Sequence, residues 1–222
     1  MKKIVCLLFT ILVCGSVYAQ IEVIKWSGIQ KYSIANDSIG NADVVFLGNS
    51  ITENWIKCHP DFFKDNKYTG RGISGHTSYQ FLLRFREDVI KLSPKIVVIN
   101  AGTNDIAENC GTYVEEYTFG NIISMVELAQ SNGIKVIMSS VLPASAFKWK
   151  ASIKDTVIKI KNLNERLKEY ATKNNIPYSK EAFKSLLLKI FILSNCFFGC
   201  HNPSKRLPLQ NYVLWPADRA QS

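Results

Sequence analysis

Three residues of this chain have the types and surroundings that acyl-transfer chemistry needs. Ser50 lies in the sequence GNSIT, directly after the apolar residues 44–47. Gly75 ends the sequence GISG, and Asn104 lies in the sequence GTND. A serine hydroxyl becomes a nucleophile when a neighbouring base takes its proton, and the tetrahedral intermediate then needs hydrogen-bond donors for its oxyanion. We therefore predict a nucleophile at Ser50, with the N–H of Gly75 and the side-chain amide of Asn104 as donors.

Each of these segments also has a purely structural interpretation. A serine after a strand often caps the next helix, and Ser-Gly and Thr-Asn-Asp sequences are common in turns. Residues 48–52 alone would also suit a phosphate or nucleotide site at a helix start, although that turn contains no lysine. The joint occurrence of the three segments in this order favours a hydrolase-type site. Within it, we expect Asp105 to hold its own turn by bonding backbone amides.

The periodicity of apolar residues predicts the elements that position these segments. Apolar, β-branched runs predict strands, and amphipathic stretches between them predict helices. The strands are expected at residues 44–47, 96–100 and 134–141, and the helices at residues 112–130, at residues 154–171 and from residue 79 towards Pro94. In the last of these helices Leu82, Phe85 and Val89 share the face expected to be buried, which leaves Arg84 and Asp88 outside it.

The alternation of strands and helices predicts an α/β fold of three layers, α/β/α, with a mostly parallel central sheet. Ligands of such sheets bind outside the carboxyl ends of the strands. Because each of the three candidate segments follows a strand or an extended stretch, we expect Ser50, Gly75 and Asn104 to gather at one edge of the sheet.

The first residues have the pattern of an export signal. Two lysines precede the apolar residues 4–13, and a small-x-Ala cleavage site precedes Gln20. We expect a signal peptide at residues 1–19 and a periplasmic or extracellular mature protein. The apolar run is shorter than the roughly 20 residues that a spanning helix needs. Cys14 offers a lipoprotein alternative, which the large Val13 before it disfavours.

Composition argues against several other classes. The formal net charge of +9 is spread along the chain, without the basic-aromatic pattern of nucleic-acid binders. No later stretch is long and apolar enough for a transmembrane segment. The cysteines after the leader are Cys58, Cys110, Cys196 and Cys200, which could pair in three ways. Cys196, Cys200 and His201 could instead bind zinc, but no second close pair of ligands accompanies them. No metal or other cofactor is therefore expected.

The three segments resemble the motif blocks of the SGNH, or GDSL-type, esterase and lipase superfamily. Residues 48–52 resemble block I, with Asn49 where many members have Asp. Residues 72–75 resemble block II, and residues 102–105 resemble block III. The resemblance covers residues 26–177. Within it the sequence is similar to exported members from Bacteroidota, several of which resemble carbohydrate deacetylases.

This resemblance implies both a fold and a set of roles. The fold would be the flavodoxin-like SGNH hydrolase fold. Ser50 would be the nucleophile, and the oxyanion hole would comprise the N–H of Ser50, the N–H of Gly75 and the amide of Asn104. Asn49 and Asp105 would support these residues.

The fourth block of the superfamily, Asp-x-x-His, is incomplete in this chain. The histidines are His59, His76 and His201. We expect His59 in an exposed loop and His76, beside the predicted oxyanion glycine, in contact with substrate. His201 is the candidate base, but Phe198 stands three residues before it, so another acceptor such as a backbone carbonyl or Asp218 would have to orient the imidazole. Disabling the orienting Asp of serine hydrolases costs on the order of 10⁴ in kcat.

The chain after Pro177 departs from the superfamily pattern. Residues 183–198 are apolar except for Lys189 and a few other polar side chains. We hypothesise a change of reading frame near codon 178, in which case a neighbouring frame should encode Asp-Gly-x-His-Pro. The expected organisation is one domain at residues 20–177 with a divergent C-terminal segment, residues 178–222.

The sequence as a whole predicts an exported serine ester hydrolase. It would remove small O-acyl groups, acetyl foremost, from a carbohydrate or lipid-like ester through an acyl-enzyme at Ser50. The alternative is a catalytically impaired binding protein, because the Asp-x-x-His block is degenerate. Trp55 and Trp149 are expected either to line the substrate pocket or to pack in the core. The oligomeric state is left open.

Overall fold

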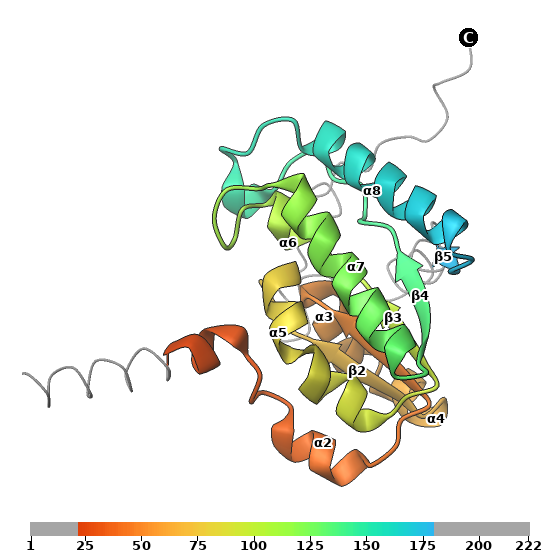
Figure 1. The fold of residues 1–222 in the computed structure, drawn as a ribbon. Coiled ribbons are helices and arrows are strands. Elements are labelled where there is room, and N and C mark those ends of the chain that lie inside the picture. Colours follow the sequence, from red (N-terminus) through yellow and green to blue (C-terminus); the bar gives the residue numbers. More distant parts are fainter. Residues whose placement is uncertain (1–21, 180–222) are drawn as a thin grey trace, which may run out of the picture.

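A parallel five-stranded sheet forms the centre of the molecule (Figure 1). The computed structural model describes residues 22–179. The strand order is β2-β1-β3-β4-β5, and every neighbouring pair is parallel. The strands are β1 Val44–Gly48, β2 Tyr68–Gly72, β3 Ile96–Ile99, β4 Lys135–Ser139 and β5 Tyr178–Ser179. The predicted mostly parallel sheet is confirmed.

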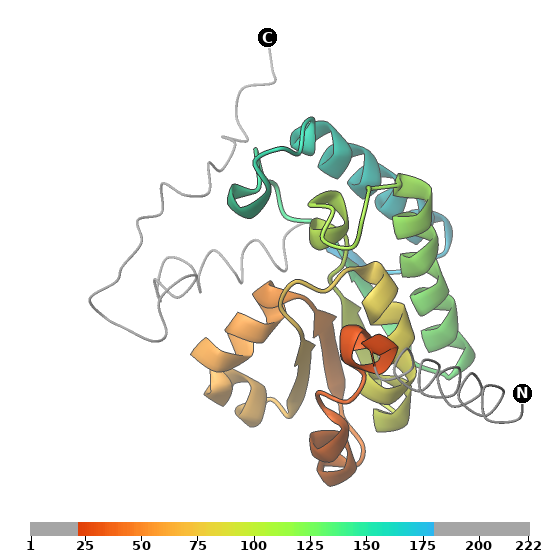
Figure 2. The same cartoon turned by 90° about the vertical axis from the view of Figure 1, so that its left-hand side faces the viewer.

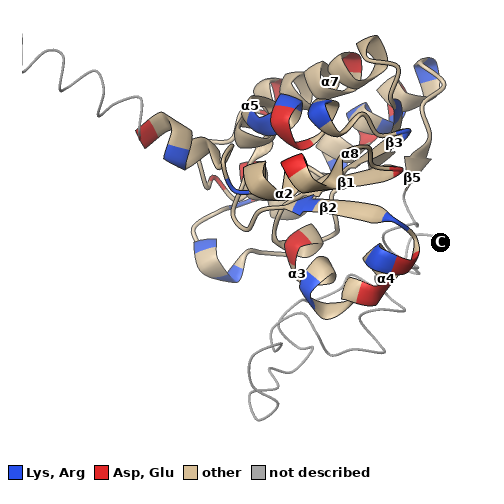
Figure 3. Cartoon of the chain, turned by 90° about the horizontal axis from the view of Figure 1, so that it is seen from below, with Lys and Arg blue, Asp and Glu red and all other residues tan. Residues whose placement is uncertain are grey.

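Helices connect successive strands and cover both faces of the sheet. They are α2 Ser33–Ile39, α3 Ser50–Cys58, α4 Pro60–Asp65, α5 Ser78–Asp88, α6 Thr103–Ile106, α7 Glu115–Ser131 and α8 Thr156–Lys173, with 3-10 turns η1 Ile90–Leu92 and η2 Lys148–Lys150. The view along the sheet shows α5 and α7 on one side and α3 and α4 on the other (Figure 3). The expected α/β/α layering is therefore present, and Figure 2 shows the same arrangement from the side.

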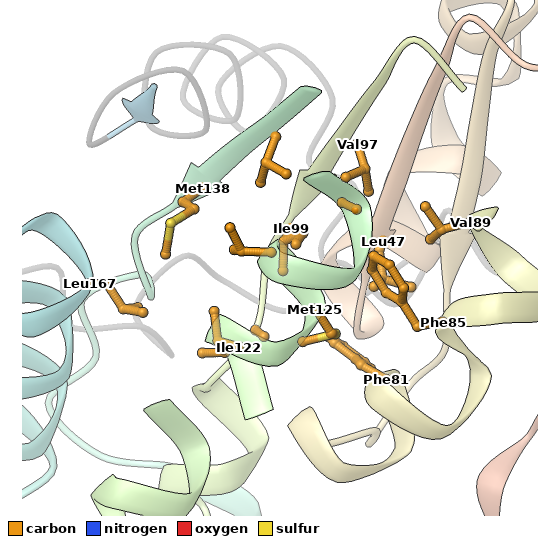
Figure 4. Close-up of a cluster of buried hydrophobic side chains, with 14 of the residues drawn as sticks. Leu47, Phe81, Phe85, Val89, Val97, Ile99, Ile122, Met125, Met138 and Leu167 are labelled. Atoms are coloured by element: carbon orange, nitrogen blue, oxygen red, sulfur yellow. The ribbon is translucent and has the colours of Figure 1, made fainter. Parts of the chain in front are cut away.

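Alternation along the central strands explains the two layers. In β1, Val45 and Leu47 are almost fully buried in the larger hydrophobic cluster, which α5, α7 and α8 complete (Figure 4). Phe46, between them in sequence, belongs to the smaller cluster under α3 and α4. Successive side chains of a strand point to opposite faces. A strand buried on both sides therefore has the continuous apolar sequence from which β1 was predicted.

The three predicted helices correspond to α5, α7 and α8. The α7 helix ends at Ser131, and Gly133 has a φ of 71°, which glycine adopts at little cost. The N–H of Ile134 then bonds the carbonyl of Ala129, which closes the turn into β4. The helix-ending turn expected before Ile134 is thus confirmed.

The prediction that Arg84 and Asp88 lie outside the buried face of α5 is wrong. Both side chains are fully buried, and they form an i,i+4 ion pair inside the protein. Arg84 also donates to the carbonyls of Gly48 and Arg71, at 3.1 Å and 3.0 Å. Apolar periodicity does not foresee this arrangement, because the partners of Arg84 are Asp88 on the same helix and carbonyls of two strands.

Several expectations concern residues that the structure does not describe. The signal peptide, Cys14, Cys196 and the chain from residue 180 onward, with His201, lie outside residues 22–179. Within the described residues, no helix is long and apolar enough to cross a membrane. The sheet itself includes Tyr178–Ser179, just beyond the domain boundary expected after Pro177.

Candidate active site

Ser50 is the first residue of α3, directly beyond the carboxyl end of β1. Asn49 is the N-cap residue, and its side-chain oxygen accepts the N–H of Ile51 at 2.9 Å. The hydroxyl of Ser50 is partly exposed and makes no hydrogen bond to any residue within 22–179. Because Asn49 supplies the side-chain cap, Ser50 is not needed for it. Its hydroxyl lies where unpaired helix amides favour developing negative charge.

The turn before Ser50 requires a glycine. A Cβ added to Gly48 would lie 2.0 Å from the side-chain oxygen of Thr52, so a larger residue would push α3 away from β1. The carbonyl of Gly48 accepts two hydrogen bonds, from the N–H of Ile73 at 3.0 Å and from Arg84 at 3.1 Å. Arg84 therefore connects the buried ion pair to the strand end that presents Ser50.

Gly75 lies in the β2–α5 loop, residues 73–77. Its φ is 79°, its surface is exposed, and a Cβ added to it would meet no described atom within 4 Å. A glycine in this left-handed region turns the chain without the strain that another residue would carry. The N–H of Gly75 bonds no described residue, whereas its carbonyl accepts the side-chain amide of Asn109 at 3.2 Å. A backbone donor is thus left available at the surface of this loop.

Glu53 anchors the same loop to the helix of Ser50. Its carboxylate accepts the N–H of Ser74 at 2.7 Å and the ammonium groups of Lys31 and Lys57 at 2.8 Å and 3.1 Å. Burial opposes ionisation of Glu53, but the hydrogen bonds from Lys31, Lys57 and Ser74 outweigh it and lower the pKa to about 2. Glu53 is therefore ionised at any ordinary pH.

Asn104 lies on α6, beyond the end of β3, and is almost fully buried. One N–H of its side-chain amide donates to the carbonyl of His76 at 2.8 Å. A side-chain amide carries two donor hydrogens, so a second N–H remains for another acceptor. The bond to His76 places the α6 turn directly against the β2–α5 loop.

Asp105 fixes α6 to the start of α5. Its carboxylate accepts the N–H of Ser78 at 3.0 Å and 3.1 Å, the hydroxyl of Ser78, and the hydroxyl of Thr118 at 3.4 Å. Burial raises the pKa of Asp105, while the bonds from Ser78 act in the opposite direction. We expected Asp105 to hold its own turn, but its main partner lies on another helix. The carboxylate thus joins the second and third candidate segments.

The imidazole of His76 is turned toward the N-terminal segment. A Cβ added to Gly28 would lie 2.5 Å from Cε1 of His76, and Nδ1 of His76 is buried without a partner among the described residues. Burial and the nearby charges of Arg84 and Lys31 lower the pKa of His76 to about 4. His76 therefore contributes a carbonyl, for Asn104, and a neutral side chain packed on Gly28.

His59 and Trp55 both pack around α3. His59 joins α3 to α4 and is half-buried rather than exposed as expected, because the two helices meet there. Trp55 is 3% exposed. Its ring packs against Phe46 and Phe62, with centroid distances of 5.3 Å and 5.0 Å. In this structure Trp55 belongs to the core beneath α3.

Sequence reasoning did not single out Asn109 or Glu53. Asn109 donates its backbone N–H to the carbonyl of Asn104 at 3.1 Å, and its side-chain oxygen accepts the indole N–H of Trp149 at 3.3 Å. With the bond to Gly75, Asn109 connects both predicted oxyanion segments to Trp149. Neither residue belongs to a motif with a fixed spacing, so only the folded chain shows these connections.

Comparison with known proteins identifies the family of the chain. A model of the GDSL-like lipase/acylhydrolase family matches residues 46–181, which include all three candidate segments. The chain belongs to the GDSL-like lipase/acylhydrolase family. The resemblance found in the sequence is therefore confirmed.

Solved structures of the GDSL-like family share the fold and much of the sequence. A protein of Bacteroides fragilis assigned as an acylhydrolase is 61% identical, with a TM-score of 0.68, over 69% of this chain and 76% of that chain. A GDSL-like lipase of Bacteroides thetaiotaomicron is 59% identical, with a TM-score of 0.67, over 68% of this chain and 77% of that chain.

A curated relative, an uncharacterized lipoprotein of Bacillus subtilis, is 29% identical over 123 residues. The match covers 47% of this chain and 50% of that protein, so the chain spans about half the length of this curated relative.

Proposed function

We propose that the protein is an exported serine ester hydrolase that removes small O-acyl groups, acetyl foremost, through a covalent acyl-enzyme at Ser50. The observation that carries this proposal is the set of hydrogen bonds that joins the three candidate segments. Ile73 bonds the strand end before Ser50, and Asn104 bonds the carbonyl of His76 next to Gly75. The nucleophile and both predicted donors thus lie on segments that contact one another.

The reaction would proceed in two steps. The oxygen of Ser50 attacks the acyl carbonyl, and a base takes the hydroxyl proton and delivers it to the leaving alcohol. The N–H groups of Ser50 and Gly75 and the second amide hydrogen of Asn104 would stabilise the oxyanion. Water then attacks the acyl-Ser50 ester with help from the same base, which releases the acid and restores the hydroxyl.

His201 is the base that we propose. It lies outside the described residues, and Phe198 occupies the place of the orienting Asp. Loss of that carboxylate costs on the order of 10⁴ in kcat where it has been removed from serine hydrolases. We therefore expect a slow enzyme whose residual rate depends on the nucleophile and the oxyanion donors.

The packing beneath α3 supports a small acyl group. Phe46, Trp55 and Phe63 fill that side of the sheet with rings in mutual contact, at centroid distances of 5.1–5.7 Å. A long acyl chain needs extended apolar surface to leave water. These aromatic side chains fill the core beneath α3, and on this basis we propose acetyl rather than a fatty acyl chain.

Export is proposed from the leader-like residues 1–19, and the lipoprotein among the relatives is in keeping with it. Expression of the full chain in a Gram-negative host, followed by cell fractionation and N-terminal sequencing, should give a mature form beginning near Gln20. A product that begins at residue 1 and stays in the cytoplasm would overturn the export proposal.

Hydrolysis of p-nitrophenyl acetate and p-nitrophenyl octanoate by the purified chain tests the reaction. We expect acetate to be preferred, and Ser50→Ala to lower the acetate rate to the background of the buffer. Ser131→Ala, an exposed serine at the far end of α7, is the matched control and should leave the rate unchanged. A fluorophosphonate should phosphonylate Ser50 with loss of fluoride, so that the mass of its phosphonyl group is added to the unmodified chain but not to Ser50→Ala. Equal rates for the unmodified chain and Ser50→Ala would remove Ser50 from the mechanism.

A further inference from the structure

Trp149 is an exposed aromatic residue tied to the candidate site. It lies in η2, and half of its surface is accessible to solvent. Its indole N–H donates to the side-chain oxygen of Asn109 at 3.3 Å, while the amide of Asn109 donates to the carbonyl of Gly75 at 3.2 Å. Trp149 is therefore only one residue removed from the loop that presents the predicted oxyanion N–H.

Two contacts orient the Trp149 ring. Its polar edge bonds Asn109, and its ring lies 5.2 Å from that of Phe147, centroid to centroid, at an interplanar angle of 40°. Phe147 is itself 1% exposed and belongs to the main core cluster. A ring held by a buried neighbour and a hydrogen bond loses little conformational freedom when a ligand binds its free surface.

The surroundings of Trp149 decide what kind of ligand suits it. Both sequence neighbours of Trp149, Lys148 and Lys150, are exposed, so the exposed ring lies between two cationic residues along the chain. A fatty acyl chain needs a continuous apolar strip. A pyranose ring needs less, because one face presents C–H groups to an aromatic face while its hydroxyls stay in water or bond to charged and amide groups.

We propose that Trp149 is the subsite for the alcohol part of the substrate, and that this part is a sugar ring. The pyranose stacks on the exposed surface of Trp149, and an acyl group carried by the sugar then reaches the Gly75 loop. This inference rests on the proposed function and narrows its substrate from a carbohydrate or lipid-like ester to an acylated carbohydrate. Asn109 is a positioning residue, since it holds the ring and the loop at a fixed separation.

The test compares a sugar ester with an ester that has no ring. The substrates are methyl 2,3,4-tri-O-acetyl-β-D-xylopyranoside and ethyl acetate, both acetyl esters. Trp149→Ala should raise KM for the sugar ester about tenfold and change kcat/KM for ethyl acetate by less than about threefold. Trp149→Phe keeps a ring and loses the indole N–H, so it should retain most of the preference for the sugar ester.

Trp26→Ala is the matched control, because this tryptophan is 45% exposed and its side chain lies in the N-terminal segment. It should leave the ratio of the two kcat/KM values unchanged. An unchanged ratio of the two kcat/KM values in Trp149→Ala would overturn the proposal. If both values fall equally, Trp149 is a structural residue. Circular dichroism and the thermal midpoint of each variant identify any loss that comes from misfolding, in which case Trp149→Phe decides.

Binding separates this proposal from the proposed function. In Ser50→Ala protein, ligand-observed NMR should detect the acetylated xyloside, and adding Trp149→Ala should abolish the signal. If the unmodified chain hydrolyses neither ester but this Trp149-dependent binding persists, the sugar subsite stands and the hydrolase proposal fails. If both esters are hydrolysed and no Trp149-dependent binding or rate ratio is found, the subsite fails alone.

Discussion

Replacing Glu53 removes the connection between the helix of Ser50 and the loop of Gly75. Glu53 lies three residues after Ser50 on α3, and its carboxylate accepts the N–H of Ser74, the residue before Gly75, at 2.7 Å. Glu53→Ala leaves this N–H without a protein acceptor. The loop then keeps its other bonds, among them Ile73 to Gly48 at 3.0 Å. We expect a displaced oxyanion donor in an otherwise folded protein.

The size of the effect follows from the partners of Glu53. A hydrogen bond to a charged group contributes about 1.5–3 kcal/mol, whereas ion pairs to exposed lysines contribute about 0–1 kcal/mol. The side chain of Lys57 is 61% exposed, and Ser74 is exposed enough for water to replace the lost acceptor. The expected loss of stability in Glu53→Ala is therefore about 1–2 kcal/mol.

Glu53→Ala should also lower kcat, because the loop that carries the oxyanion donor is displaced. Removing an oxyanion donor outright costs about 10²–10³ in kcat. Because the bonds from Ile73 and Asn109 still hold the loop, we expect Glu53→Ala to lower kcat by about tenfold, with KM nearly unchanged. Glu53→Gln keeps one oxygen that accepts the Ser74 N–H and replaces the oxygen that accepts Lys31 and Lys57 by an amide donor, so its kcat should stay within about threefold.

The assay is the hydrolysis of p-nitrophenyl acetate, with kcat and KM measured separately for both variants. Glu87→Ala is the matched control, because Glu87 also pairs with a lysine four residues along the chain, Lys91 in η1. Its kcat should not change. The reasoning is refuted if Glu53→Gln loses as much kcat as Glu53→Ala, or if Glu53→Ala acts on KM alone.

Two further predictions concern buried groups. Arg84→Met leaves Asp88 buried without its ion-pair partner and should lower the free energy of unfolding by about 3–5 kcal/mol, or the thermal midpoint by about 6–20 °C. Adding Asp88→Leu should recover part of this loss. No recovery in the double variant would contradict the role of the ion pair. The pKa of His76, about 4, lies below the ordinary value of 6.5, so the unfolded chain binds this proton first. The stability that depends on His76 should therefore be lost as pH drops from 6.5 to 4 and should not change further below pH 4. When the free energy of unfolding is measured by urea titration at each pH, His76→Gln should remove this part of its dependence on pH. An unchanged pH dependence would exclude His76 as its source.

The central strands could be predicted from sequence because their own side chains carry the signal. β1, β3 and β4 lie between two layers of helices, so each contains an unbroken apolar run, at residues 44–47, 96–99 and 136–138. β2 is an edge strand with the sequence YTGRG. Both of its glycines are required because neighbouring residues leave no room for a side chain. A Cβ on Gly70 would lie 2.1 Å from Ile56, and one on Gly72 would lie 2.2 Å from the backbone nitrogen of Glu53. Requirements of this kind depend on α3, and β2 alone does not reveal them.

The candidate site also contains residues that the sequence predicts and residues that only the folded structure shows. Ser50, Gly75 and Asn104 have a recognisable sequence because each lies in a short segment whose local geometry is demanding. The residues that hold these segments together have no such local requirement. Glu53 and Asn109 act through a carboxylate and an amide whose partners are distant in sequence, such as Ser74 and Trp149. Their importance depends on what the fold brings to them, and a single sequence does not contain that information in local form.

Arg84 shows why helical periodicity failed at a charged position. The carbonyl of Gly48 is the last acceptor of β1, at the point where the chain turns into α3, and it needs donors that the sheet does not fully supply. Ile73 gives one and Arg84 gives another. A cation at a core position of α5 is therefore the consequence of a strand ending inside the protein. Since Asp88 stands one turn further along α5, the same helix supplies the anion that makes this burial tolerable.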